Sequence, residues 1–415
     1  MTKHILKQIW NQRAVNIWLW CELMLVALCL GYLTDYLYST ATTYSLPLGY
    51  DTEHVYLVKL GTVTADSKEY RNEGDSLTLL RLTDAVTRMR AYEGVEALSV
   101  SLGAHPYNQR NSSGSRGVDT TWVHGWVFTV SPQFFRVFRV TDKQGQIDPL
   151  VSAATQPDAL IATEEAERKF AEQGITLLAS GVKYWGAEQP EMVTRAISDN
   201  IRFTDFAPYY PAYYQCRSEV DLIRQGTSEA EFCIRVRPDA DTPAFLSQFR
   251  QAMKTQLRLG NLYLMDVTGF DDLRNNFYRS NGLINEVRTH VAGLSFLLLN
   301  ILLGVIGTFW IRTQQRRAEL GLRMAMGSSH FGLFRLLAAE GLLLLILAFL
   351  PASLVLGNLA YADIIGNSEF PFTIARFLIG QGITFLLMAL MIIIGIWYPA
   401  RQAMHIQPAE ALHEE

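Results

Sequence analysis

The sequence predicts a membrane α-helical protein with four transmembrane helices, and an extracytoplasmic mixed α/β domain between the first and second helices. Three runs without a charged residue, at 291–311, 341–362 and 377–400, are 21, 22 and 24 residues long. About 20 apolar residues cross ~30 Å of hydrocarbon as a helix, so each run can span a bilayer. A fourth apolar segment lies near the N-terminus, and a long polar region separates it from the other three.

The first helix is expected at residues 17–38, after an N-terminal arm at 1–16. The uncharged stretch between Glu22 and Asp35 is only 12 residues long. Aromatic residues extend the segment on both sides, as is typical at membrane interfaces. The alternative is a cleavable signal peptide with a basic N-terminal end and small residues at 39–41. The acidic residue and the tyrosines before those small residues favour the transmembrane helix.

The charges of the loops predict the orientation of the helices. Lys and Arg gather in the N-terminal arm and in the loop after the second span, whereas the loop between the third and fourth spans is poor in them. Positively charged loops stay on the cytoplasmic side. Both termini are therefore expected in the cytoplasm, and residues 39–289 outside it.

The region 39–289 is expected to form the mixed α/β domain. Alternating apolar residues predict strands at 54–60 and 95–102, and helical spacing predicts a helix at 76–92 between them. The same strand–helix–strand order recurs between 232 and 267. A further short strand leads into a helix capped at Thr163. Two β-α-β-like units therefore flank a more irregular middle.

Two features of this domain leave alternatives open. The segment 206–214 (FAPYYPAYY) either forms an aromatic binding patch or packs its tyrosines into the core or over a sheet edge. Cys216 and Cys233 would lie in an oxidising compartment, where they could form a disulfide.

The composition argues against several functions. A formal net charge of -4 is too near neutral for a nucleic-acid binder. The histidines of the outer region are isolated, and no metal-ligand or catalytic pattern is present, so we expect neither a metal site nor catalysis. The sequence contains no GxxxxGK[ST] loop, so ATP binding by a P-loop would need a partner chain.

The loop after the second span is expected to form a short helix at 313–327. It consists of good helix formers, and Glu319 and Arg323 form an i,i+4 pair in the favourable order. Gly327 is placed to end this helix, and Ser328 or Ser329 to cap the next one. A solvated basic helix beside anionic lipid would explain the arginines equally well.

The segment 316–329 (RRAELGLRMAMGSS) resembles the E-[IL]-G-x-[LR]-[RK]-A-[LM]-G signature of FtsX-type ABC transporter permeases. The C-terminal YPARQAMHIQPAEALHEE is similar to the closing motif of that family, with matches that include Pro408, Glu410 and Leu412. His413 stands where that family has arginine. The layout of four spans and a large outer domain resembles the MacB-type branch.

The resemblance implies a permease region at 290–415, with spans at 291–311, 333–360 and 376–400 and a cytoplasmic tail at 401–415. The helix at 313–327 would couple to a separate cytoplasmic ABC ATPase, which binds the ATP, and the chain needs no cofactor of its own. The residues implied to carry this coupling are Arg316, Arg317, Glu319, Gly321, Arg323, Ala325 and Gly327.

The same resemblance implies a bacterial cytoplasmic (inner) membrane location and further partners. These are a second copy or a sister permease, a periplasmic adaptor in some systems, and membrane lipid.

The polar groups in the spans have two possible interpretations. Glu22, Asp35, Asn300 and Glu340 are candidates for a role in mechanism, because ionisable groups inside membranes are costly. Interface placement or structural pairing explains them equally well, and Glu340 is expected to pair with an arginine of the inner loop. With so few polar groups, the spans are poorly suited to line a hydrophilic channel.

Three functions follow from these observations. The first is a permease subunit that passes ATP-driven motion to the outer domain for export of a peptide, drug or lipoprotein. The second is an ATPase-driven regulator of an envelope enzyme or a sensor kinase. The third is a passive membrane receptor or scaffold, which would have no need of a helix between two spans.

Overall fold

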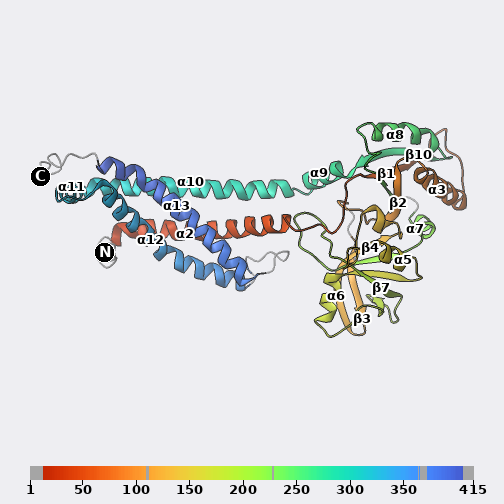
Figure 1. Ribbon diagram of the computed structural model, residues 1–415, viewed down its shortest axis with the longest axis horizontal. Helices are drawn as coiled ribbons and strands as arrows, with labels where there is room; N and C mark the ends of the chain where they lie inside the picture. Colours follow the sequence, from red (N-terminus) through yellow and green to blue (C-terminus); the bar gives the residue numbers. More distant parts are fainter. Residues whose placement is uncertain (1–12, 109–111, 227–228, 363, 365–371, 405–415) are drawn as a thin grey trace. The chain divides into compact units, whose positions relative to one another are not determined.

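The computed structural model describes residues 13–108, 112–226, 229–362, 364 and 372–404. The chain divides into a helical unit (1–43 and 283–415) and an α/β unit, Tyr44–Gly282 (Figure 1). Among the described residues, four helices are long and apolar enough to cross a membrane, and the α/β unit lies between the first and second of them in the sequence. The predicted fold class is therefore confirmed.

The four long helices of the helical unit are α2 (Arg13–Tyr44), α10 (Leu283–Gln315), α12 (His330–Tyr361) and α13 (Ile374–Met404). They pack around one apolar core, to which all four contribute, with Leu30, Val305, Leu345 and Ile392 among its fully buried side chains. Glycines permit this packing: a Cβ on Gly341 would lie 2.7 Å from Ile396 Cδ1.

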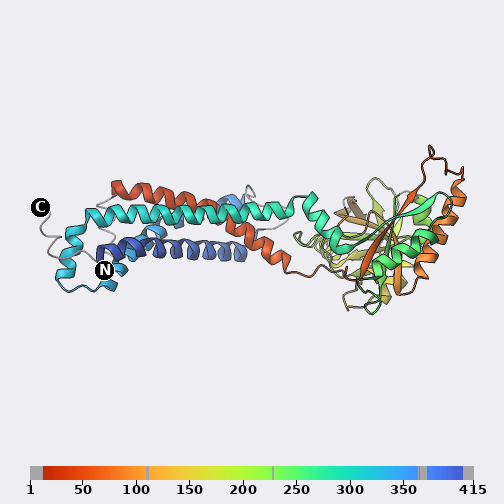
Figure 2. The same ribbon diagram turned by 90° about the horizontal axis from the view of Figure 1, so that it is seen from above.

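α2 and α10 lie side by side and run in opposite directions (Figure 1 and Figure 2). The Tyr36 ring stacks on His290 with centroids 3.8 Å apart. Further along, Leu33 packs on Gly293, and the carboxylate of Glu22 lies over Gly304. Because the two residue numbers sum to the same value in each pair, the two helices keep one antiparallel register over their length.

The first two and the last two strands of the α/β unit form one antiparallel sheet in the order β10-β1-β9-β2. Its strands are β1 (Val55–Thr62), β2 (Val95–Leu102), β9 (Ala230–Val236) and β10 (Leu262–Gly269). Its apolar core includes residues of α3 (Asp75–Arg90), α7 (Glu219–Gln225) and α8 (Phe245–Gln256). The two predicted strand–helix–strand units are present, but they interleave into one sheet, as in ferredoxin-like folds.

The middle of the α/β unit closes six strands into a ring. Its order is β3-β4-β8-β5-β7-β6, with β6 pairing back to β3. The strands are β3 (Ser113–Val118), β4 (Thr121–Val130), β5 (Ala159–Thr163), β6 (Gly181–Tyr184), β7 (Met192–Ser198) and β8 (Ala212–Cys216). Ring closure leaves these strands without a long free edge.

Short helices connect these strands. They are α4 (Phe134–Val137), α5 (Asp148–Ala154) and α6 (Glu164–Ala171), and α9 (Phe270–Ser280) leads out of the unit. Thr163 precedes α6 as predicted, but its hydroxyl accepts a hydrogen bond from the Ala212 backbone N–H at 3.0 Å instead of capping the helix. β4 also pairs with β2 at Ser101 and Leu102, which joins the ring to the open sheet.

Candidate functional site

The loop between α10 and α12 forms the short helix α11 (Arg317–Ala325). The prediction of one helix over 313–327 was wrong in its limits, because α10 continues to Gln315 and Arg316 breaks the helical path with φ -108° and ψ 19°. Gly327 has φ +96°, a conformation that favours glycine. The Ser329 hydroxyl accepts from the Gly332 N–H at 3.1 Å and so caps α12.

α11 is tied to the long helices by an inner charge cluster, formed by Arg312, Arg316, Glu319, Arg323 and Glu340. Arg312 Nη1 donates to Glu340 Oε1 at 3.2 Å, and Arg316 Nη1 donates to Glu340 Oε2 at 3.1 Å. Glu340 is only 2% exposed, so its charge is compensated by arginines rather than by water. The pairing expected for Glu340 is therefore present.

The same arginine reaches into α11. Arg316 Nε and Nη2 donate to the two carboxylate oxygens of Glu319 at 2.9 and 3.2 Å. Arg323 Nη2 donates to Glu319 Oε1 at 2.9 Å, the predicted i,i+4 pair. The hydrogen bonds from Arg316, with those from Arg323, hold the pKa of Glu319 below its ordinary value. Arg316 thus bridges a carboxylate of α11 and a carboxylate of α12.

The surface of α11 presents apolar side chains. Leu320 is 1% exposed and Gly321 is buried, whereas Leu322 is 49% exposed and Met326, just after the helix, is 73% exposed. Arg317 and Ala325 belong to α11, but their side chains lie outside the described part of the structure. The helix therefore has one side anchored in the bundle and another with apolar side chains free to contact a partner.

The polar groups of the spans have separate environments. Arg376 Nε donates to Asp35 Oδ1 at 3.0 Å and links the first turn of α13 to α2. Glu22 is half-buried beside Gly304, and Asn300 is exposed on α10. The predicted motif residues Pro408, Glu410 and Leu412 lie outside the described residues.

The two buried cysteines of the outer unit do not form a disulfide. Cys216 lies on β8 and Cys233 on β9, and both are free. β2 and β4 lie between their strands, so the two strands are about 14 Å apart at ~4.8 Å per spacing, well beyond disulfide reach. Burial raises the pKa of Cys216 to about 12 and that of Cys233 well above its ordinary value.

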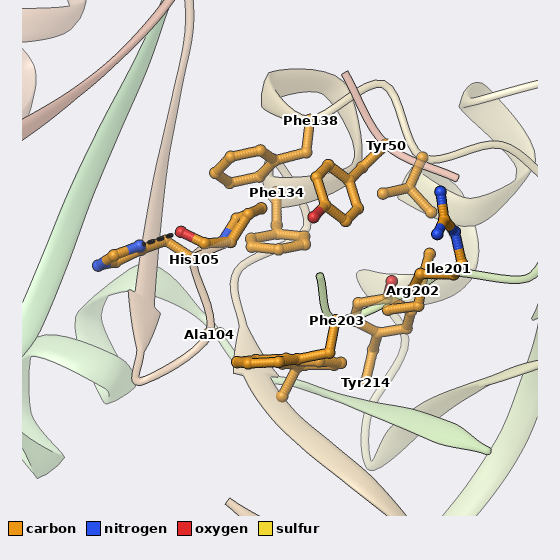
Figure 3. A pocket seen from close by; sticks show the side chains of 12 residues that line it. Tyr50, Ala104, His105, Phe134, Phe138, Ile201, Arg202, Phe203 and Tyr214 are labelled. Carbon is orange, nitrogen blue, oxygen red and sulfur yellow. Dashed lines mark hydrogen bonds between the residues drawn. The ribbon is translucent and has the colours of Figure 1, made fainter. Parts of the chain in front are cut away.

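The aromatic segment 206–214 serves packing for the most part. Tyr213 and Tyr214 are 0% and 1% exposed, and the Phe206 ring lies 5.3 Å from that of Tyr278. Tyr214 contributes to a cavity of about 20 Å³, lined also by Tyr50, Phe134, Phe138 and Phe203 (Figure 3). That volume holds about one water molecule, which is far too little for a drug-sized ligand.

Both ends of the outer unit meet at a buried pair, Arg202 and Asp205, which are 1% and 4% exposed. Arg202 donates to the carbonyls of Leu46 and Pro47, just after α2, and to the Asp205 carbonyl. The Asp205 carboxylate accepts from Arg274 at 2.8 and 3.0 Å. It also accepts from the phenols of Tyr107 and Tyr278. We call these two residues and their partners the Arg202–Asp205 cluster.

Three of these charged residues, Arg312, Arg376 and Arg202, were not predicted as partners from the sequence. The expected pairing of Glu340 with an inner-loop arginine did not single out Arg312, although its place at the end of an apolar run is a signal of a buried pair. No pattern in the sequence connects Arg376 with its partner Asp35, which is 341 positions away. Arg202 stands in a segment without periodicity and offered no signal.

These features define a membrane protein with four helices of spanning length, a short anchored helix between two of them, and an inserted α/β unit. Residues 291–408 match the family of FtsX-like permease C-terminal domains. The match covers 118 of the 415 residues and confirms, over this part of the chain, the resemblance to FtsX-type permeases seen in the sequence.

Three solved structures are similar to this chain over 51–55% of its length. One is a domain of a permease protein from Porphyromonas gingivalis. The match covers 55% of this chain and 99% of the Porphyromonas chain, at 13% identity and a TM-score of 0.34. The periplasmic region of MacB from Actinobacillus actinomycetemcomitans covers 55% and 94%, at 12% identity and a TM-score of 0.35.

The extracellular domain of the ABC-type transporter YknZ from Gram-positive bacteria covers 51% of this chain and 100% of its own, at 10% identity and a TM-score of 0.31. These likenesses are too weak to carry an argument about function. A comparison with curated protein sequences gives no match.

Proposed function

We propose that this chain is the permease subunit of an ABC-type complex, in which a separate cytoplasmic ATPase binds α11 and supplies the energy. The observation that carries the proposal is the bridge made by Arg316 between Glu319 of α11 and Glu340 of α12. A helix that is anchored by a buried ion pair moves together with the spans to which it is paired. A surface helix that only contacts lipid needs no such anchor.

In this proposal the ATPase binds the exposed apolar side of α11, at Leu322 and Met326. Both termini and α11 lie in the cytoplasm, and the α/β unit lies outside the inner membrane, as the loop charges favour. The chain itself binds no ATP and catalyses no reaction. Its spans contact lipid, and it works beside a second permease.

The output of the complex is movement of the outer unit. Its ends follow α2 and precede α10 in the chain, and the Arg202–Asp205 cluster ties both ends to the same buried loop. The proposed result is export of a peptide, drug or lipoprotein, with a periplasmic adaptor in a tripartite system. The small interior cavity of the outer unit does not favour a drug-sized ligand bound inside it.

Affinity purification from membranes tests the proposed ATPase contact. We expect an ABC ATPase to co-purify with the wild-type chain and to be lost with Leu322→Asp, because a charge would be placed in an apolar contact. Leu178→Asp is the matched control, since Leu178 is 48% exposed in the outer unit and Leu322 is 49% exposed. An ATPase that is retained by Leu322→Asp, or is absent from every sample, would contradict the proposal.

A further inference from the structure

Arg116 is a buried arginine on β3, in the six-stranded ring of the outer unit. In the register of the ring it lies opposite Val123 of β4 and Tyr184 of β6. Val118, two positions further along β3, belongs to the apolar core of the ring, and side chains two apart on a strand share a face. Arg116 therefore faces this core. It is 6% exposed, so only a small part of the side chain reaches the surface.

The Arg116 guanidinium has few partners among the described residues. Nη1 donates to the Ser115 carbonyl at 3.1 Å, and the guanidinium carbon lies 4.5 Å from the centre of the Tyr184 ring. Nε is fully buried without a hydrogen-bond partner, and no described residue accepts a hydrogen bond from Nη2. Contact with an aromatic face offsets only part of the cost of burying an unpaired charge.

No described carboxylate pairs with Arg116. The residues of the outer unit outside the described ranges, 109–111 and 227–228, include no Asp or Glu. The other buried arginines described in this unit have more partners. Arg235 Nη1 lies 3.3 Å from Asp51 Oδ2, and Arg202 donates to three backbone carbonyls. The unit thus supplies no counter-charge for Arg116 from its own side chains.

The two nitrogens of Arg116 that lack an acceptor form the edge that binds carboxylates elsewhere in this chain. Arg274 donates from Nε and Nη2 to the two oxygens of Asp205 at 3.0 and 2.8 Å. Arg316 donates from the same two nitrogens to Glu319 at 2.9 and 3.2 Å. This planar fork matches the geometry of a carboxylate. A carboxylate also carries a single negative charge, which one guanidinium balances, whereas a phosphate dianion would leave excess charge against an apolar core.

We propose that the Nε and Nη2 edge of Arg116 binds a free carboxylate, carried by a small organic acid or by the C-terminal end of a peptide. The carboxylate enters where the side chain reaches the surface. The rest of the ligand stays outside the ring, because apolar side chains such as Val127 and Met192 fill its interior. Since Nε is fully buried, binding also requires a small shift of the Arg116 side chain. This site belongs to the outer unit alone and does not depend on the ATPase contact.

Equilibrium dialysis of the full chain, purified in detergent without its ATPase, tests the site. The probes are radiolabelled N-acetylalanine and radiolabelled N-acetylalaninamide, which differ only in the carboxylate, at equal ionic strength. We expect the acid to bind at least about tenfold more tightly than the amide, as hydrogen bonds to a charged group predict. Equal binding of the two probes by the wild-type chain would overturn the proposal without any variant.

Three variants assign the binding to Arg116. Arg116→Met should lower binding of N-acetylalanine to the level of the amide, because an apolar side chain of similar length replaces the guanidinium. Arg116→Lys keeps the charge without the planar fork and should bind at least about threefold less than wild type. Arg195→Met is the matched control, since Arg195 is exposed on β7 of the same ring, and its binding should stay within about twofold of wild type. The rate of protease digestion checks that each variant is folded.

Unlabelled acetate and trialanine identify the source of the carboxylate. Displacement of the labelled acid by acetate supports the site and indicates a small organic acid, whereas displacement by trialanine alone supports it and indicates a peptide end. Undiminished binding by Arg116→Met would overturn the proposal, because the carboxylate would then bind elsewhere. An equal loss of binding in Arg195→Met would also overturn it, because net charge alone would then explain the binding.

Discussion

At the scale of single residues, Glu340 is the most tightly constrained group of the inner charge cluster. It stands at the start of an apolar run and is nearly inaccessible to water, yet Arg312 and Arg316 each contact one of its oxygens. Buried charges of this kind are tolerated only with their partners in place. The residue therefore fixes where the end of α10, α11 and α12 meet.

Replacing Glu340 by alanine should destabilise the helical unit by about 3 kcal/mol, because two buried arginines lose their shared counter-charge. Thermal unfolding of the purified protein in detergent measures this loss. Glu188→Ala, at an exposed site of the outer unit, is the control and should change the midpoint little. Equal midpoints for both variants would show that the buried pair does not stabilise the unit.

Glu319 predicts a dependence on pH. Its pKa is lowered in the folded protein by Arg316 and Arg323, so the folded state favours the ionised form. Its contribution is therefore complete above the ordinary pKa of about 4.3 and is lost as pH falls through the lower folded value. The difference in unfolding midpoint between wild type and Glu319→Gln should be present at pH 7 and should shrink steadily as the pH falls below about 4.3. A difference that persists unchanged at pH 3 would exclude this charge effect.

At the scale of elements, the Arg202–Asp205 cluster holds the two ends of the outer unit. Asp205→Asn keeps the size of the side chain but removes the charge that faces Arg274. We expect a loss of about 1–3 kcal/mol in stability of the outer unit, since the buried carboxylate of Asp205 loses its charge while Arg274 remains partly accessible to water. Protease digestion of the full chain reports the opening of this unit, with Asp239→Asn as the exposed control. The two variants should differ clearly in their rate of digestion.

The cysteines give a second prediction for the outer unit. Cys216 and Cys233 should remain thiols in protein purified without reductant, because β2 and β4 separate their strands. Intact-mass measurement after alkylation in denaturant counts the free thiols. Added reductant should not change the unfolding midpoint. A mass that lacks two alkyl groups, restored by reductant, would show a disulfide instead.

The sequence predicted the elements well where a regular pattern carried them. Charge-free runs located the spans, and alternation located β1 and β2, because both signals are local. The six-stranded ring was not predicted, since its strands are short and pair across long separations, such as β4 with β8. The pair of Asp35 and Arg376 was missed for the same reason, whereas the pair of Glu319 and Arg323 lies within one helical turn and was predicted.

At the scale of the whole molecule, each of the two units contains a buried cluster of charged residues that holds segments of that unit together. In the helical unit, the inner charge cluster ties α11 to α10 and α12. In the outer unit, the Arg202–Asp205 cluster ties the segment that follows α2 to α9, which precedes α10. Movement of α11 by a partner is therefore expected to reach the spans, and movement of α2 or α10 to reach the outer unit.

The most direct test of this account is the ATPase activity of the complex purified with its ATPase, wild type beside Arg316→Lys. Lysine keeps the charge but cannot contact Glu319 and Glu340 in the manner of the arginine fork. We predict that Arg316→Lys still binds the ATPase through Leu322 and Met326, while stimulation of ATP hydrolysis by the permease falls at least severalfold. Full stimulation by Arg316→Lys would contradict the claim that this bridge joins α11 to the spans.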